Sequence, residues 1–438
     1  MAGRYKAYSE YKDSGVDWLH DIPSHWKTIP VGRCYHRVKR TGYESEELLS
    51  VYRDHGVIPK SSRDDNNNKA SDDLSPYQLV CENNLVMNKM KAWQGSIAIS
   101  EHRGIVSPAY FVYEPFKNTE SIVYPKYVHY LLRHPIYITQ YMSRSKGIRV
   151  NQWDLDPESF QSIELLLPRK EEQQKIIRFL DHETAKIDTL IAKQEILIEL
   201  LREKRQAVIS HAVTKGLNPD APMKDSGVDW LGEVPEHWSV KGFNHCAKIR
   251  GGLVDPKLEQ YKDLVLYAPN HIEKETGKVI YKESADAQGA DSNKYLCFKG
   301  EVIYSKIRPA LAKVALCDEE VALCSADMYP IDAYNGLTNT FLYWFLLSDS
   351  FTKAVVLDSD RVAMPKVNRE SLGEYRVPVP PLDEQLEICN SIKYQSRILD
   401  ELEEKASYQI ALMKERKTAL ISAAVTGKID VRDWVGDC

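Results

Sequence analysis

Basic and amide side chains gather in three segments of the N-terminal half, and the chemistry that these residue types suggest is binding of nucleic acid. The segments are Cys34 to Arg40, Asn88 to Gln94 and Arg144 to Gln152. Lysine and arginine neutralise phosphates and displace counterions, whereas arginine, asparagine and glutamine can read base edges. The candidate DNA-binding residues in these segments are Arg37, Lys39, Arg40, Lys89, Lys91, Trp93, Arg144, Lys146, Arg149, Asn151 and Gln152.

Three segments at matching places in the C-terminal half carry a similar set. They are Cys246 to Arg250, Ser305 to Pro309 and Asp358 to Lys366. The candidate DNA-binding residues here are Lys248, Arg250, Lys306, Arg308, Arg361 and Lys366. A run of charge taken alone is also typical of a solvated surface. The recurrence of the segments in both halves favours the binding interpretation.

The net charge of -5 does not exclude a nucleic-acid partner, because basic residues are sorted along the chain. The stretches 22–43 and 121–153 contain no acidic residue, while acids cluster elsewhere, as in Glu46-Glu47 and Asp64-Asp65. What matters for DNA binding is where the basic groups lie, not their total. The sequence therefore allows a basic face on an acidic protein.

Residue patterns typical of catalysis and of cofactor binding are missing from the sequence. There is no G-x-x-x-x-G-K-[ST] phosphate loop, no G-x-G-x-x-G and no Asn/Asp-Pro-Pro-aromatic motif. The eight cysteines contain no C-x-x-C pair, so neither a zinc site nor a disulfide framework is indicated. We therefore predict no catalytic residue, no cofactor and no metal, and expect a binding protein.

The chain is an internal repeat. Lys12 to Leu19 recurs without change as Lys224 to Leu231, and further identities follow at the same spacing, including a Pro-x-His-Trp element, a Glu-Gln pair and an Ala-Val-Thr triplet. Eight consecutive identities are not a chance event. The repeated motif holds Asp, His and Trp but no nucleophile, so we interpret it as a clamp that fastens the start of each copy onto a core.

Each copy ends in a long helical pattern. Apolar residues recur with a period of 3.5 from Ile176 and again from Ile388, and Gly216 and Gly427 stand where helix-ending glycines belong. An antiparallel pairing avoids facing two cations across the seam. In the antiparallel arrangement Glu183 lies opposite Arg416, and Lys204 lies opposite Gln395.

The predicted fold is mixed α/β (α+β), with two similar globular parts and two long antiparallel coiled-coil helices related by a pseudo-two-fold axis. We expect globular parts at 1–168 and 217–380, and helical spacers at 169–216 and 381–431. Within the globular parts we expect β-rich segments at 84–100 and 301–316 and short apolar helices at 127–132 and 340–347, while the two copies diverge between the repeated motifs. The N-terminus has no signal-peptide pattern, and the longest apolar stretch is too short for a membrane span. We therefore expect a cytoplasmic protein without membrane contact.

The duplicated DSGVDWL…P-x-H-W element, the helix starts RKEEQQKII and PLDEQLEI, and the closing AVTKGL and AVTGKI resemble the specificity subunit of type I restriction–modification systems. The resemblance covers essentially the whole chain. It implies two target recognition domains, each reading one half of a bipartite double-stranded DNA site, with helices that set the spacing. It also implies two methyltransferase subunits that methylate adenine with S-adenosylmethionine, and restriction subunits that bring ATP-driven translocation and cleavage.

Two other classes of function stay open at this point. A fused methyltransferase or nuclease would need a cofactor motif that the sequence does not display, and binding of S-adenosylmethionine by the isolated chain would favour it. A coiled-coil scaffold without a DNA role would lack salt-dependent binding to duplex DNA.

Overall fold

The computed structural model describes residues 5–53, 55–63, 71–147, 153–359 and 366–436. The chain divides into two compact units. Unit 1 combines Met1–Ala192 with Ile410–Cys438, and unit 2 is Lys193–Gln409. Each unit holds one β-rich part, which we call domain 1 in unit 1 and domain 2 in unit 2. Each also holds one end of both long helices, α5 (Lys170–Lys215) and α9 (Leu382–Val425).

A four-stranded antiparallel sheet of the same strand order lies in each domain. If the four strands of each sheet are numbered along the chain, both sheets have the order first, fourth, second, third, so they share one topology. This confirms the β-rich interpretation of 84–100 and 301–316. Domain 1 has the order β4-β11-β8-β9, with β4 (Tyr35–Val38), β8 (Leu85–Asn88), β9 (Ile97–Ile99) and β11 (Tyr110–Pro115). Domain 2 has the order β18-β25-β22-β23, with β18 (Ala247–Ile249), β22 (Val302–Ser305), β23 (Val314–Leu316) and β25 (Met328–Ala333).

Two further strand pairs recur in both domains and frame the start and end of each copy. A hairpin carries the repeated motif, and the strand after it pairs with the strand that leads into the long helix. In domain 1 these are β1 (Tyr11–Asp13) with β2 (Asp21–Pro23), and β3 (Lys27–Pro30) with β14 (Glu164–Leu167). In domain 2 they are β15 (Met223–Asp225) with β16 (Glu233–Pro235), and β17 (Ser239–Gly242) with β26 (Arg376–Val379).

The remaining strands differ between the domains. Domain 1 has three two-stranded sheets, which are β5 (Leu49–Tyr52) with β6 (Gly56–Pro59), β7 (Gln78–Val80) with β10 (Gly104–Val106), and β12 (Ser145–Lys146) with β13 (Asp154–Leu155). Domain 2 has a second four-stranded sheet of order β19-β21-β24-β20, made of β19 (Leu253–Val254), β20 (Leu266–Tyr267), β21 (Lys294–Phe298) and β24 (Val321–Cys324). The divergence predicted for the interior of the repeat therefore lies in these elements.

Short helices complete the core of each domain. The predicted apolar helices are confirmed as α2 (Pro125–Leu132) and α6 (Asn339–Leu347). Six of the nine residues of α6 are buried, as expected for a helix that is apolar on all sides. The others are α1 (Val31–Cys34), α3 (Pro135–Arg144), α4 (Pro157–Gln161), α7 (Asp349–Ser359) and α8 (Arg369–Glu374).

The repeated motif is a clamp, as interpreted from the sequence. In unit 1 the Trp26 indole donates to Glu172 on α5 at 3.0 Å, and His25 Nε2 lies 2.8 Å from the same carboxylate. In unit 2 Trp238 and His237 bind Glu384 on α9 in the same way, at 3.0 and 2.7 Å. Each clamp fastens the chain after the first hairpin to the first turn of its long helix.

The next residue of each helix, a glutamine, continues the clamp. Gln173 Nε2 donates to the carbonyls of Ile122 and Pro168, and its Oε1 accepts from the Tyr124 amide. Gln385 repeats this pattern on the carbonyls of Gly336 and Pro380. Both glutamines are fully buried, so they satisfy backbone groups that would otherwise be orphaned. The Glu-Gln pair at the start of each helix therefore has a structural role.

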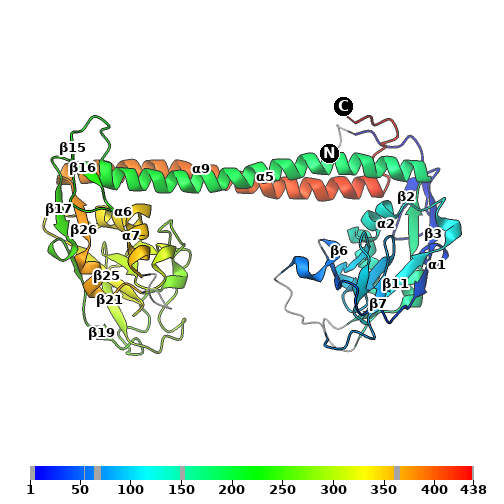
Figure 1. Ribbon diagram of the computed structural model, residues 1–438, viewed down its shortest axis with the longest axis horizontal. Helices are drawn as coiled ribbons and strands as arrows, with labels where there is room; N and C mark the ends of the chain where they lie inside the picture. Colours follow the sequence, from blue (N-terminus) through cyan, green and yellow to red (C-terminus); the bar gives the residue numbers. More distant parts are fainter. Residues whose placement is uncertain (1–4, 54, 64–70, 148–152, 360–365, 437–438) are drawn as a thin grey trace. The chain divides into compact units, whose positions relative to one another are not determined.

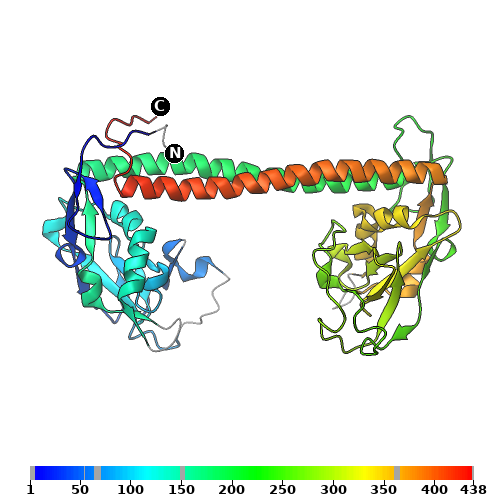
Figure 2. The same ribbon diagram turned by 180° about the vertical axis from the view of Figure 1, so that it is seen from behind.

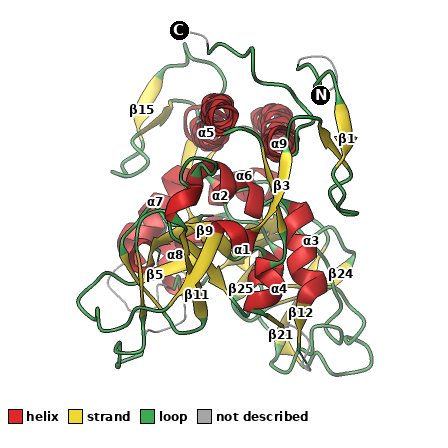
Figure 3. Cartoon of the chain, turned by 90° about the vertical axis from the view of Figure 1, so that its right-hand side faces the viewer, coloured by secondary structure: helices red, strands yellow, loops and turns green. Residues whose placement is uncertain are grey.

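The two long helices run antiparallel and side by side in each unit, which confirms the predicted orientation (Figures 1, 2 and 3). In unit 1 Asp188 of α5 pairs with Lys417 of α9 at 2.7 Å. In unit 2 Arg202 and Arg205 of α5 pair with Glu403 and Asp400 of α9. Gly216 and Gly427 adopt φ of 79° and 73° directly after the helices, as helix-ending glycines do.

The residues that join the helices differ from the four polar seam residues named from the sequence. Lys204 and Arg416 are exposed, Gln395 donates to Ser391 of its own helix, and Glu183 accepts from Tyr5. The observed ion pairs Asp188–Lys417 and Arg205–Asp400 instead shift the helix register by several residues from the predicted pairs. A straight helix has 3.6 residues per turn and drifts away from a seam of period 3.5. The register therefore required the structure.

Among the helices that the structure describes, none is long and apolar enough to cross a membrane.

Candidate nucleic-acid interface

The sheet of domain 1 brings the first two basic segments to the same edge. Strands β4 and β8 both run antiparallel to β11, and Val112 of β11 faces Val38 of β4 and Val86 of β8. Strands β4 and β8 both end beside the first residues of β11. Lys39 and Lys89, which follow these strands directly, therefore lie at the same edge of the sheet, where the strands end. This edge is the first part of the candidate interface.

The third segment of domain 1 adjoins the second. The Leu155 amide donates to the Lys89 carbonyl at 3.1 Å, and the Lys89 ammonium lies 3.5 Å from Asp154. Trp93 and Trp153 meet edge to face, with 5.0 Å between ring centroids. Lys146 of β12 is the strand partner of Asp154 of β13, so Lys146 lies on the same surface as Lys89.

Domain 2 brings its three segments together through a matching set of contacts. The Val367 amide donates to the Lys306 carbonyl at 2.8 Å, and Ile307 forms an isolated bridge with Lys366. The Arg369 guanidinium donates to the carbonyls of Arg250 and Ile249, at 2.7 and 3.3 Å. Segments that are far apart in the sequence thus form one surface in each domain.

The predicted cations of domain 1 fall into two groups. Arg40 pairs with Glu114 at 3.0 Å, Lys89 with Asp154, and Arg144 donates to Ser162 at 2.9 Å, so these three are engaged inside the domain. The Arg37 guanidinium stacks 4.1 Å above the ring of Phe111. Within the described part of domain 1, three predicted cations are exposed and make no side-chain hydrogen bond, ion pair or contact with an aromatic ring, and these are Lys39, Lys91 and Lys146.

The cations of domain 2 divide in the same way. Arg250 forms an ion pair with Glu301, which is only 4% exposed, and that hydrogen bond raises the pKa of Arg250 above its ordinary value. The Lys306 ammonium lies 5.4 Å from the centre of the Tyr329 ring. Three predicted cations are exposed and free of such contacts among the residues described for domain 2, namely Lys248, Arg308 and Lys366. Each domain therefore offers one free cation from each of its three segments.

Four predicted residues, Arg149, Asn151, Gln152 and Arg361, lie outside the described residues.

The structure also adds residues that the sequence did not indicate. Phe111 supports Arg37, and Arg369 lies between the rings of Tyr295 and Tyr329, at 5.4 and 5.2 Å. No local pattern marks these partners, because they come together only through the pairing of distant strands.

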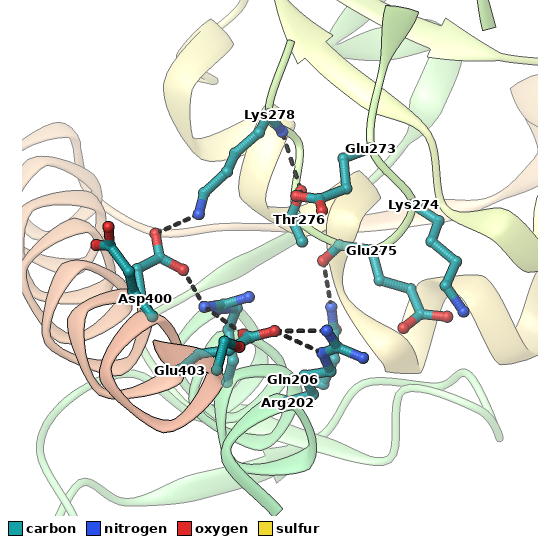
Figure 4. Close-up of a pocket in the computed structure, with 12 residues that line it drawn as sticks. Arg202, Gln206, Glu273, Lys274, Glu275, Thr276, Lys278, Asp400 and Glu403 are labelled. Atoms are coloured by element: carbon teal, nitrogen blue, oxygen red, sulfur yellow. Dashed lines mark hydrogen bonds and ion pairs between the residues drawn. The ribbon is translucent and has the colours of Figure 1, made fainter. Parts of the chain in front are cut away.

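A charged cavity of about 460 Å³ in unit 2 lies between the loop at 273–278 and the two long helices (Figure 4). Lys278 pairs with Asp400 at 2.8 Å, and Gln206 donates to the Glu275 carbonyl at 2.8 Å. Gly277 packs so closely on Tyr343 that an added Cβ would overlap the Tyr343 hydroxyl. The Lys278–Asp400 ion pair and the Gln206–Glu275 hydrogen bond fasten domain 2 to the helices at this cavity.

A family model described as the type I restriction modification DNA specificity domain matches residues 235–420. The chain is 26% identical to the type I restriction enzyme EcoDI specificity subunit of Escherichia coli, over 93% of this chain and 89% of that protein. It is 23% identical to the MjaVIII specificity subunit of Methanocaldococcus jannaschii, over 97% and 98% of the two chains. The matches to the two relatives span both copies of the repeat, and the family model matches the second copy.

Solved structures share the fold. A chain from a structure on complex assembly and conformational transition of the type I R-M system gives a TM-score of 0.67 at 12% identity, covering 92% of this chain and 98% of that one. The HsdS subunit from Thermoanaerobacter tengcongensis gives 0.52 at 13% identity, with coverage of 93% and 98%. Taken with the duplicated clamp and the antiparallel helices, these comparisons show that the chain is similar over its whole length to specificity subunits of type I restriction–modification systems.

Proposed function

We propose that this chain is the sequence-specific, double-stranded DNA-binding subunit of a type I restriction–modification complex. The observation that carries the proposal is the convergence of three basic segments in each domain, with one exposed, unpaired cation from each. Such cations are available to phosphates and base edges, whereas Arg40 and Arg250 are occupied inside the protein. The relatives' description as specificity subunits supports the same role.

The repeat suggests how a bipartite target is read. Domains 1 and 2 share a frame but differ in their exposed segments, so each would read a different half-site, and α5 and α9 would fix the gap. We propose the division into target recognition domains at 1–168 and 217–380, with helical spacers at 169–216 and 381–431. Domain 1 would use Arg149, Asn151 and Gln152 in addition to its free lysines, and domain 2 would use Arg361.

The chemistry of the complex would belong to other subunits. Two methyltransferase subunits would use S-adenosylmethionine to methylate adenine, and restriction subunits would supply ATP-driven translocation and DNA cleavage. Because the chain is a two-fold repeat, we expect two copies of the methyltransferase subunit per chain. Native mass measurement of the purified complex checks this, and a one-to-one assembly at saturation would contradict it.

The DNA interface is tested by removing the free cations. The triple variant Lys39→Ala, Lys91→Ala, Lys146→Ala should bind duplex DNA more weakly and with a flatter salt dependence, by up to about one unit of slope per lysine. The matched control removes three exposed lysines of the long helices, Lys193, Lys204 and Lys414, and should keep the salt slope.

The same measurement separates the alternatives. Equal salt slopes for both triple variants and the parent chain would remove these segments from the DNA interface. A chain that shows no salt-dependent binding to duplex DNA would be a scaffold. Adenine methylation by the isolated chain would instead identify a fused enzyme.

A further inference from the structure

We propose that Arg308 reads a guanine in the major groove, so that the half-site of domain 2 contains a G·C pair whose recognition depends on this one side chain. The inference rests on the proposed function, and it adds a base identity and the residue that determines it. Arginine is suited to this contact because its planar fork matches the O6 and N7 acceptors of guanine.

The backbone around Arg308 is fixed on both sides. Before it, the Lys306 amide donates to the Asp327 carbonyl at 3.0 Å, and Ile307 bridges to Lys366. After it, the short helix Pro309–Leu311 begins with the buried Pro309. The Leu311 amide closes the turn by donating to the Arg308 carbonyl at 2.9 Å. Arg308 is therefore presented by a rigid turn, as a base-reading side chain needs to be.

The turn holds Arg308 in a conformation that arginine rarely adopts. Its φ of 48° and ψ of 59° lie in the left-handed region, and Ala312 at the other end of the turn has φ of 40°. A residue that precedes proline is normally extended, which makes this conformation less favourable still. Glycine would fit here at lower cost. Backbone strain of this kind persists where the surrounding structure imposes it, and it concentrates at functional sites.

The side chain of Arg308 is exposed and uncommitted, in contrast to its neighbours. Arg250 is held by Glu301, and Arg369 is held by two carbonyls and two aromatic rings. The side chain of Arg308 makes no hydrogen bond or ion pair with any described residue. Burial lowers the pKa of Lys313, and the nearby guanidinium of Arg308 contributes to this shift. The turn is thus an electropositive point without a neutralising partner.

Domain 1 has a lysine, Lys91, at the matching place before its short helix Ala92–Gln94. Its exposed Arg37 stacks on the ring of Phe111, and the predicted cations that are exposed and free of partners among the residues described for domain 1 are all lysines. A lysine ammonium neutralises phosphate as a point charge, but it lacks the planar fork of arginine. The proposal therefore concerns the half-site of domain 2 alone.

The test is selection of duplexes from a randomised library by the full chain and three variants. Arg308→Ala and Arg308→Lys both lose the fork, but the lysine variant keeps the charge. Arg376→Ala, which changes an exposed arginine of β26 in the same domain, is the control. Thermal unfolding of each variant checks that the fold is intact.

The parent chain and the control should select a G·C pair at one position of one half-site, by about tenfold over other pairs. Both Arg308 variants should lose that preference and keep the preferences at every other position. If Arg308→Ala weakens binding equally for all sequences and Arg308→Lys restores it, Arg308 contacts phosphate and the inference is wrong. Absence of any sequence preference in the parent chain would overturn the proposed function as well.

Discussion

Domains 1 and 2 use the same frame but differ in how deeply it is buried. The side chain of Glu172 is 8% exposed and that of Glu384 is 24% exposed, although both bind the same His-Trp pair. Tyr8 accounts for part of the difference, because its hydroxyl donates to Glu172 at 2.7 Å. The Arg432 guanidinium lies 5.1 Å above the Tyr8 ring. Residues near both ends of the chain therefore cover the clamp of unit 1, whereas the clamp of unit 2 is more exposed to solvent.

The exposed basic segments, unlike the His-Trp clamps, differ between the two domains in residue type. Their positions in the frame match, but their side chains do not, since free lysines dominate domain 1 and Arg308 distinguishes domain 2. The contacts of the His-Trp pair with a helix glutamate recur in both copies, whereas the surfaces diverge. The comparison separates residues that stabilise a shared frame from residues that could give each domain its own specificity.

The largest expected effect comes from moving the two domains without changing either. Deleting one heptad from each helix, Leu190 to Ile196 and Leu402 to Tyr408, preserves the heptad phase and shortens the spacer by roughly 10 Å. The preferred gap should shrink by roughly three base pairs, and affinity for the original gap should fall by about a thousandfold. Selection from a library with fixed half-sites and random gap length measures this.

A shortened chain that folds, binds and still selects the original gap would show that the helices do not set the spacing. Rotation around the duplex also changes when the gap changes, because the groove turns once in about 10 base pairs. Retention of both half-site sequences at the new gap is therefore the decisive result.

The clamps give the next largest effect and compare the two units directly. Glu172→Ala leaves Tyr8 and Trp26 without their buried acceptor and should destabilise unit 1 by about 3–4 kcal/mol. Glu384→Ala removes fewer contacts in a more open site and should cost about 1–2 kcal/mol. Urea unfolding of the two variants and the parent chain measures both values. Equal losses would mean that the covering by the chain ends adds nothing to the clamp.

Acid should loosen unit 1 through two histidines of domain 1. Burial lowers the pKa of His129 and of His134 from 6.5 to about 4. The unfolded chain therefore binds more protons than the folded chain between these values, and stability should fall as the pH falls from about 6.5 to about 4. The loss is at most about 3 kcal/mol for each histidine.

Urea unfolding of the parent chain and of the double variant His129→Gln, His134→Gln across this pH range checks the assignment. The variant should show a weaker dependence on pH, even if its stability at neutral pH is lower. An unchanged pH dependence would place the acid sensitivity on other groups.

The smallest effect concerns the strained turn of domain 2. Arg308→Gly removes a left-handed arginine and should raise the free energy of unfolding, by up to about 1 kcal/mol, while Arg308→Ala keeps the strain. Thermal unfolding of both variants provides the measurement. A glycine variant that is less stable than the alanine variant would show that the turn is not strained at this residue.

Much of the fold followed from patterns that are local in sequence. The repeated motif, the long heptad patterns and the glycines after them predicted two copies with antiparallel helices, and short apolar runs predicted α2 and α6. The helix register was missed, because a seam of period 3.5 cannot be followed along straight helices without knowing their partner. The interpretation of the Trp-His motif as a clamp was correct, yet its acceptor, Glu172 or Glu384, lies 146 residues from the tryptophan.

The sequence by itself determined that the chain is a two-fold repeat in which each copy ends in a long helix, because identity over a repeated motif and helical periodicity are properties of residue order. Only the tertiary structure decided which cations are free. Arg250 and Arg308 are indistinguishable as residue types, but strand pairing places the buried Glu301 beside Arg250, while a rigid left-handed turn holds Arg308 in solvent. The physical reason is that ion pairing and burial depend on neighbours from distant strands, which a local pattern does not contain.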